Sequence, residues 1–251
     1  MDFFVTFLLL IPTLSSFHAI KAADSELILT VFNNCPFTIW PAIQPNSGYP
    51  VLEQGGFELQ ALTYRSFPAP SQSWSGRMWA RTGCAWYNSR FSCDSGECSG
   101  HFGCNGVGAE TPVTLAQFSV RTGINCNLAS YDVSLVDGFN LPMTITPHEG
   151  NGVCPVVGCM ADLLANCPSV FQVQCPPGSG RVVACKSGCG AFNSDELCCR
   201  NQYSNTDMCK PSVYSKFFKN ICPDTSTYPS DKPFHPRECY SPRELKVIFC
   251  Q

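Results

Sequence analysis

Cysteine is the residue that most constrains this chain, with 18 copies among 251 residues. All of them follow an apolar run from Phe3 to Ile11, which at about nine residues is too short for a membrane span of about 20 residues. Pro12 and small residues as far as Ala22 and Ala23 come next, so we expect a signal peptide over residues 1–22, with a buried strand as the alternative. An even number of cysteines in an exported chain is typical of disulfides rather than zinc sites. We therefore expect a secreted protein with no metal and no other cofactor.

The charge balance narrows the range of partners. Lys and Arg number 16 against 19 Asp and Glu, so the chain lacks the basic surplus that binds phosphate backbones, and we expect no nucleic-acid partner. The same balance gives only weak support for attraction to anionic membranes. No apolar stripe suggests an interface between copies, and we expect a monomer.

Short apolar stretches, several with alternating polarity, are separated by turn residues and predict strands. Their spacing favours a β-sandwich or a flattened barrel. One amphipathic helix is predicted after Ser212, an N-cap residue, because Val213, Phe217 and Ile221 recur at helical spacing. A second, short helix is expected over residues 161–166. The predicted strands cover residues 27–32, 38–40, 62–67, 77–82, 116–122, 131–135, 141–147, 182–185 and 247–250.

Motifs of common catalytic classes are missing from the sequence: it has no GxSxG, HExxH or GxxxxGK[ST] pattern. The remaining candidates for catalytic chemistry are carboxylate side chains. Asp132 and Asp137 stand five positions apart in YDVSLVDGF, so they face opposite ways on a straight strand unless the turn at Asp137-Gly138 bends it. A turn role for Asp137 and a solvated strand face for Asp132 are equally open. The histidines of the mature chain form no Cys/His or Ser/His motif, and we interpret each as a surface histidine or one satisfied by hydrogen bonds: His101, His148 and His235.

Several dispersed segments resemble the thaumatin-like proteins, a plant defence family that includes the osmotin-like proteins. The resemblance runs from about residue 26 to residue 251 and places all but two cysteines in register. Cys93-Asp-Ser-Gly-Glu-Cys98 departs from the family's C-x-T-G-D-C pattern at Ser95 and Glu97. Both keep a hydroxyl or a carboxylate, so we expect this loop to fold in the same way. The matching segments are ILTVFNNCPFTIWPAI, RMWARTGC, YDVSLVDGFNLPM, CMAD, YSKFFK, CPDT and YPSDKP.

The resemblance implies an all-β fold, a thaumatin-like antiparallel β-sandwich with two smaller disulfide-stapled parts. The sandwich is expected to comprise residues 23–81, 112–160 and 223–251. A small stapled domain is expected over residues 82–111, and a disulfide-rich loop and helix domain over residues 161–222. We expect the large aromatic side chains of Trp40, Trp79 and Phe139 to pack in the core rather than to serve as sugar platforms.

The resemblance also implies how the cysteines pair. Two of them, Cys126 and Cys175, fall outside the family set, and we favour a ninth bridge between them over two free thiols or an intermolecular pair. Closing the loop of about 215 residues between the outermost pair would stabilise the fold by about 5 kcal/mol in the chain-entropy model. The eight implied pairs are Cys35–Cys250, Cys84–Cys93, Cys98–Cys104, Cys154–Cys239, Cys159–Cys222, Cys167–Cys185, Cys189–Cys198 and Cys199–Cys209.

Antifungal members of the family have an acidic cleft between domains, lined by one Arg, one Glu and three Asp. The matching positions in this chain are Arg77, Gln117, Asp132, Asp137 and Asp231. Some members hydrolyse β-1,3-glucan weakly, with the Glu proposed as the general acid beside an Asp. Here that position is Gln117, which cannot donate a proton to a leaving oxygen but can hydrogen-bond a sugar hydroxyl. Glycoside hydrolysis generally requires two carboxyl groups, so the substitution favours binding over cleavage.

Four functional hypotheses follow. The first is a defence protein whose cleft binds a carbohydrate polymer, namely β-1,3-glucan of fungal walls. The second is a weak endo-β-1,3-glucanase that uses Asp132 or Asp137 with another acid; Glu110 is near in sequence, but nothing in the sequence places it in the cleft. The third is a membrane-perturbing or protein-interaction role. The fourth is a stable extracellular protein whose cleft binds nothing.

Overall fold

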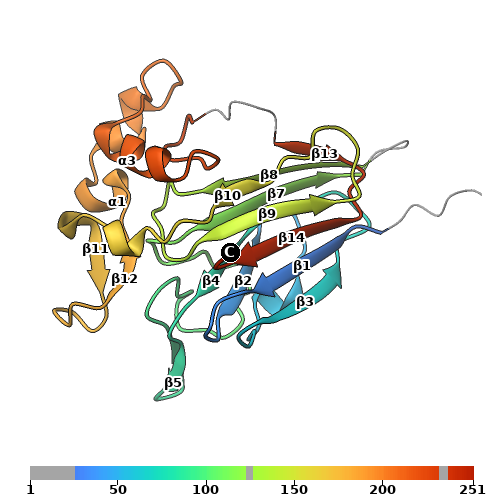
Figure 1. Ribbon diagram of the computed structural model, residues 1–251, viewed down its shortest axis with the longest axis horizontal. Helices are drawn as coiled ribbons and strands as arrows, with labels where there is room; N and C mark the ends of the chain where they lie inside the picture. Colours follow the sequence, from blue (N-terminus) through green and yellow to red (C-terminus); the bar gives the residue numbers. More distant parts are fainter. Residues whose placement is uncertain (1–25, 123–126, 232–236) are drawn as a thin grey trace, which may run out of the picture.

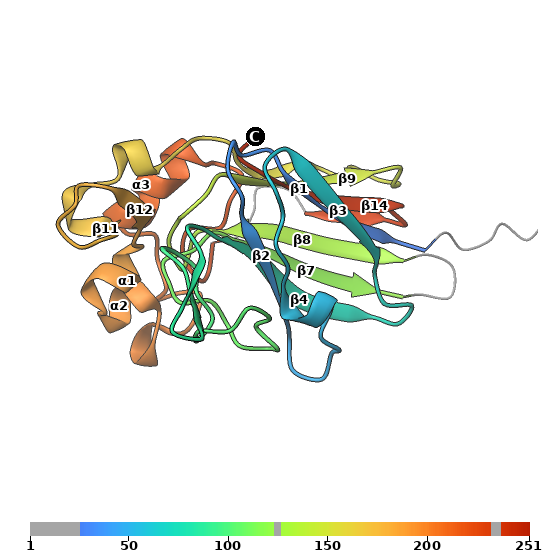
Figure 2. The same ribbon diagram turned by 90° about the horizontal axis from the view of Figure 1, so that it is seen from below.

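Two five-stranded sheets packed face to face form the body of the protein. The computed structural model describes residues 26–122, 127–231 and 237–251, so the predicted signal peptide lies outside the described residues. Figures 1 and 2 show the two layers and the helices gathered beyond one end of them. Sheet 1 has the order β10-β9-β14-β1-β3, and sheet 2 has the order β13-β8-β7-β4-β2. The all-β sandwich expected from the sequence is confirmed.

The strands of each sheet come from distant parts of the chain. Sheet 1 contains β1 (Ile28–Asn33), β3 (Thr63–Pro68), β9 (Met143–His148), β10 (Val157–Cys159) and β14 (Glu244–Phe249). Sheet 2 contains β2 (Trp40–Pro45), β4 (Trp74–Arg81), β7 (Leu115–Arg121), β8 (Leu128–Ser134) and β13 (Glu238–Tyr240). Two small hairpins are formed by β5 (Ala85–Tyr87) with β6 (Arg90–Ser92) and by β11 (Gln172–Gln174) with β12 (Val182–Cys185).

Helical segments are short. The α-helices are α1 (Gly188–Phe192), α2 (Asp195–Cys198) and α3 (Val213–Ile221), and the 3-10 turns are η1 (Glu53–Gly55), η2 (Leu164–Asn166), η3 (Ser169–Phe171) and η4 (Asn201–Tyr203). The predicted N-cap of α3 is confirmed: the Ser212 hydroxyl accepts from the Ser215 N–H, and the Ser215 hydroxyl accepts from the Ser212 N–H. The short helix predicted over residues 161–166 is only the 3-10 turn η2. Among the described residues, no helix has the length and apolar character to cross a membrane.

Strand alternation sends every second side chain into the space between the sheets. Leu29 and Val31 of β1 are buried there with Val247 of β14 and with Met78 and Val133 of sheet 2. The next residues along each strand face outward. The predicted strand at residues 38–40 was misplaced, because the ladder begins at Trp40 and continues to Pro45. Trp79 and Phe139 are fully buried as expected, whereas Trp40 is only half-buried.

The first strand, β1, and the last, β14, pair in parallel. The other strand pairs of sheet 1 are antiparallel. Just beyond this pair, the Cys35–Cys250 disulfide joins positions 215 residues apart. All eight disulfides that the resemblance implied are present among the described residues.

The predicted ninth bridge is wrong, because Cys175 has a free thiol. That thiol donates to Asp94 at 3.1 Å, and Cys126 lies outside the described residues.

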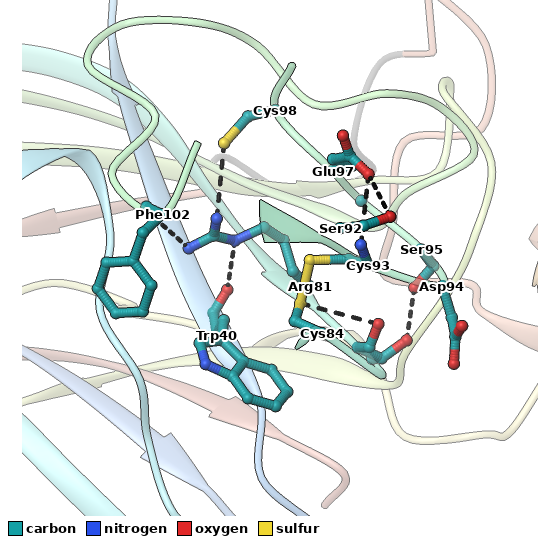
Figure 3. Close-up of a disulfide and its surroundings, with 12 residues drawn as sticks. Trp40, Arg81, Cys84, Ser92, Cys93, Asp94, Ser95, Glu97, Cys98 and Phe102 are labelled. Carbon is teal, nitrogen blue, oxygen red and sulfur yellow. Dashed lines mark hydrogen bonds between the residues drawn. A yellow bond between two sulfur atoms is a disulfide. The ribbon is translucent and has the colours of Figure 1, made fainter. Parts of the chain in front are cut away.

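A buried arginine holds the small stapled part against sheet 2 (Figure 3). The Arg81 side chain is fully buried and donates to the carbonyl oxygens of Trp40, His101 and Phe102 at 2.8–3.1 Å. Burial lowers the pKa of Arg81 to about 10, partly offset by the negative charge of Glu97. Because its donors meet backbone carbonyls of β2 and of the loop at residues 101–102, this guanidinium fixes the loop that carries the Cys98–Cys104 bridge.

Glu97, at a position where the family pattern has Asp, closes the neighbouring loop. Its carboxylate accepts from Arg90 at 2.8 Å and from the Cys93 N–H and the Ser92 hydroxyl at 3.3 Å. Burial acts to raise the pKa of Glu97, but these donors outweigh it and hold the pKa below its ordinary value. Ser95 bonds the Thr82 hydroxyl at 2.7 Å, so both departures from the family pattern keep a structural role.

Removing the terminal disulfide should destabilise the protein more than removing a short-loop one. We expect the double variant Cys35→Ala/Cys250→Ala to lose about 5 kcal/mol of unfolding free energy, because a loop of 215 residues gains far more freedom in the unfolded chain. The control Cys189→Ala/Cys198→Ala, which opens a loop of 9, should lose about 2.5 kcal/mol. Guanidinium unfolding measures both, and equal losses would contradict the prediction.

Glu97 should make stability depend on pH in acid. Its pKa is lower in the folded chain than its ordinary value of 4.5, so its contribution is complete above that value and is lost as the pH falls through the folded-state pKa. We expect Glu97→Gln to lower the free energy of unfolding by about 1–3 kcal/mol near neutral pH, and to differ little from the native protein in strong acid. Glu149→Gln, at an exposed ion pair with Arg243, is the control and should change stability by about 0.5 kcal/mol or less.

Candidate functional site

A cleft of about 630 Å³ opens on the outer face of sheet 2. Its floor comes from β7, β8 and β13, and its sides from the turn after β8 and from the segment that follows α3. Hydroxyl and carboxyl groups dominate its lining, together with Tyr131, Val136, Pro229 and Arg237. The polar residues that line it are Gln117, Ser130, Asp132, Ser134, Asp137, Ser226, Tyr228, Asp231 and Glu238.

Register brings three of the predicted site residues into one row. Arg77 of β4 is directly opposite Gln117 of β7, which is directly opposite Asp132 of β8. Residues paired in this way lie on the same face, about 5 Å apart. The neighbours Met78, Ala116 and Val133 point into the core, so the row faces outward. Arg77 does not itself line the cleft but stands beside Gln117 at its edge.

Asp132 forms an ion pair with Arg237, which sequence reasoning missed. The Arg237 side chain is only 9% exposed, and burial lowers its pKa. Its guanidinium also donates to the Ser226 hydroxyl at 3.3 Å. The adjacent Glu238 accepts from Ser130 at 3.4 Å and adds another carboxylate to the cleft. β13 has three residues, too few for a periodic signal, so nothing in the sequence marked Arg237 or Glu238.

Asp137 lies in the turn that the sequence predicted. The Gly138 N–H donates to the Leu135 carbonyl at 3.0 Å, and Leu135 and Phe139 are fully buried on either side. Burial raises the pKa of Asp137, and the positive charge of Arg77 partly opposes this rise. The turn supplies the bend that brings Asp132 and Asp137 into one cleft.

Asp231 lines the cleft, but its carboxylate also has structural partners. One oxygen accepts from Lys219 at 3.0 Å, from the Thr227 N–H at 2.8 Å and from the Thr227 hydroxyl at 3.1 Å. The side chain is 7% exposed. Asp231 therefore ties α3 to the cleft wall, and only its other oxygen is available to a ligand.

Glu110 borders a separate hollow of about 160 Å³ with Glu97 and Asp94, and does not line the cleft. In residues 26–122, 127–231 and 237–251, no cluster of His, Cys, Asp and Glu has the composition of a metal site. The cleft can therefore offer a ligand several hydrogen-bond acceptors, one amide and one buried guanidinium.

The charge of Arg77 should set the protonation of Asp137. We expect Arg77→Met to raise the pKa of Asp137 further, because the positive charge that lowers it is removed. The carboxyl carbon shift of Asp137 in an NMR titration measures this. Arg121→Met is the control. Arg121 is four residues, or about 13 Å, beyond Gln117 on β7. This exceeds the Debye length of about 8 Å, so salt largely screens the Arg121 charge. An equal effect of both variants would contradict a local interaction.

Comparisons with known proteins identify relatives of this chain. The Thaumatin family model matches residues 33–251. An osmotin-like protein of Solanum lycopersicum is 59% identical over 230 residues, covering 92% of this chain and 91% of that protein. A glucan endo-1,3-beta-glucosidase of Prunus avium is 40% identical over 242 residues, covering 95% of this chain and 94% of that protein. The solved structure of the thaumatin-like xylanase inhibitor TLXI aligns with 89% of this chain and 99% of its own, with a TM-score of 0.47 and 22% identity. The chain belongs to the thaumatin family.

Proposed function

We propose that this chain is a secreted, antifungal defence protein whose cleft binds a β-1,3-glucan-like carbohydrate. The observation that carries the proposal is the outward row of Arg77, Gln117 and Asp132 at a cleft otherwise lined by hydroxyls and carboxylates. Sugar hydroxyls both donate and accept hydrogen bonds, so a site rich in acceptors with a few donors suits them. The eight disulfides fit an oxidising, extracellular location.

Gln117 decides between binding and hydrolysis in this proposal. A general acid must be protonated and near the leaving oxygen, and an amide has no such proton. Asp132 is committed to Arg237 and Asp231 to Lys219, so neither is a free acid. The proposed protein holds the polymer without cutting it.

A weak endo-β-1,3-glucanase is the second candidate. Two observations favour it: a 40% identical relative is named glucan endo-1,3-beta-glucosidase, and burial raises the pKa of Asp137. Glycosidases separate their two carboxyl groups into one protonated acid and one ionised partner. In this chain Asp137 would be the protonated acid and Asp132 the ionised partner.

Laminarin binding and reducing-sugar release by the mature protein test both candidates. We expect the native protein to bind laminarin without releasing reducing sugar. Gln117→Glu should place a carboxyl opposite Asp132 and release reducing sugar at about 10²-fold above the background measured with the native protein, the lower range for a general acid. Gln202→Glu, which adds the same charge at an exposed position outside the cleft, should not cleave.

Each alternative result has its own meaning. Cleavage by the native protein that Asp137→Asn abolishes would replace the binding proposal with the glucanase. If the native protein does not bind laminarin, the carbohydrate proposal for the cleft fails, and membrane or protein partners become the leading hypotheses.

A further inference from the structure

The outer face of sheet 1 is open. No described segment lies over it: Figure 1 looks directly onto β9, β14, β1 and β3, and Figure 2 shows the same strands along one edge of the molecule with the helices off to one end. A hollow of about 340 Å³ lies on this face, lined by Thr30, Phe32, Tyr64, Glu244 and Lys246. Its volume is within the range of about 300–1,000 Å³ of small-ligand sites.

Strand register arranges an apolar row across the hollow. Phe32 of β1 is directly opposite Tyr64 of β3 on one side and Ile248 of β14 on the other. Neighbouring strands lie about 5 Å apart, so the row is about 10 Å long. Tyr64 is 67% exposed, so its ring contributes little to the core and is available to a ligand.

A row of polar groups runs beside the apolar one. Thr30 is opposite Ser66 of β3 and Lys246 of β14, and the two hydroxyl oxygens lie 2.8 Å apart. Thr30 is only 2% exposed, so of these two hydroxyls it is the exposed Ser66 hydroxyl that can hydrogen-bond to a ligand. The face therefore combines an aromatic row with a polar row two residues, or about 7 Å, away along the same strands.

The charged groups on this face compensate one another. The Lys246 ammonium is 3.6 Å from a Glu244 carboxylate oxygen, and that same oxygen is 3.7 Å from the His148 ring nitrogen. Among the described residues of this face, a strongly charged ligand such as a phosphate or a polycation therefore meets only charges that already have a partner. A ligand complementary to this face is electrically neutral.

From these observations we propose that the outer face of sheet 1 is a second binding site, for a neutral polysaccharide chain. The C–H faces of pyranose rings would pack on Tyr64 and Phe32, and a sugar hydroxyl would bond to the exposed Ser66 hydroxyl. The site is independent of the cleft, because it lies on the other sheet and faces away from it.

A second copy of this chain is a poorer fit to the same face. Stable interfaces bury about 800 Å² on each partner around an apolar centre. Here the apolar part is a single row of three side chains beside hydroxyls and a paired charge. A narrow chain that follows one row suits this surface better than a broad protein surface.

NMR titration of the mature protein with laminarihexaose and with cellohexaose tests the proposal. We expect one of these neutral sugars to shift the amide signals of Phe32 and Tyr64. Tyr64→Ala should weaken that binding about tenfold, and Tyr64→Phe should largely preserve it, since the ring rather than the hydroxyl makes the contact. Tyr87→Ala is the control, because Tyr87 is 73% exposed on the β5–β6 hairpin, away from this face. It should leave the binding unchanged.

Several results would overturn the proposal. One is the absence of shifts on β1 and β3 with either sugar, and another is equal weakening by Tyr64→Ala and Tyr87→Ala. Concentration-dependent self-association that Tyr64→Ala abolishes, without any sugar-induced shift, would assign the face to a second copy. Failure of the cleft proposal is distinguishable, because it removes sugar-induced shifts at Gln117 and Asp132 and leaves those at Tyr64.

Discussion

The pairing of the last strand with the first holds this molecule together. β14 lies between β9 and β1, so without it sheet 1 would separate into β9 with β10 and β1 with β3. Its inward side chains Leu245, Val247 and Phe249 are fully buried, and their loss would open the layer between the sheets. The Cys35–Cys250 disulfide lies beside this pair, and the Asn34 side chain donates to the Cys250 carbonyl at 2.8 Å. The closure of a long loop thus supports the strand on which the sheet depends.

The cleft depends on a second core outside the sandwich. Leu135 and Phe139 pack with Phe171 and Phe218 in a cluster that includes two disulfides, and the backbone of Phe139 exchanges hydrogen bonds with that of Cys185. Because both neighbours of the Asp137 turn are anchored in this cluster, the turn cannot move away from sheet 2. Lys219 on α3 reaches Asp231 on the opposite cleft wall. The disulfide-rich part therefore fixes the geometry of two cleft walls, although it contributes few residues to the lining.

Much of this arrangement was predictable from local sequence, and the remainder depended on register. Alternating apolar residues predicted β1, β3, β7 and β12 to within about two residues, and Ser212 predicted the start of α3. The resemblance implied the eight disulfides, whose connectivity cannot be deduced from spacing. The Asp132–Arg237 ion pair was missed because it requires β13 to pair with β8, and a three-residue strand has no pattern. The bridge from Cys126 to Cys175 was inferred only because both cysteines fall outside the family set, and the free thiol of Cys175 contradicts it.

The two outer faces of the sandwich follow from one rule and have different chemistry. In each sheet, alternation that buries every second side chain also displays the others in rows across strands. On sheet 2 the displayed row is Arg77, Gln117 and Asp132, and the parts built on the second core enclose it as a polar cleft. On sheet 1 no described segment encloses the row of Tyr64, Phe32 and Ile248, so Tyr64 stays exposed and the other two stay partly exposed. Since these faces point in opposite directions, a single extended polymer cannot lie along both at once. If both faces bind carbohydrate, each molecule would hold two separate chains, which is a different task from cutting one.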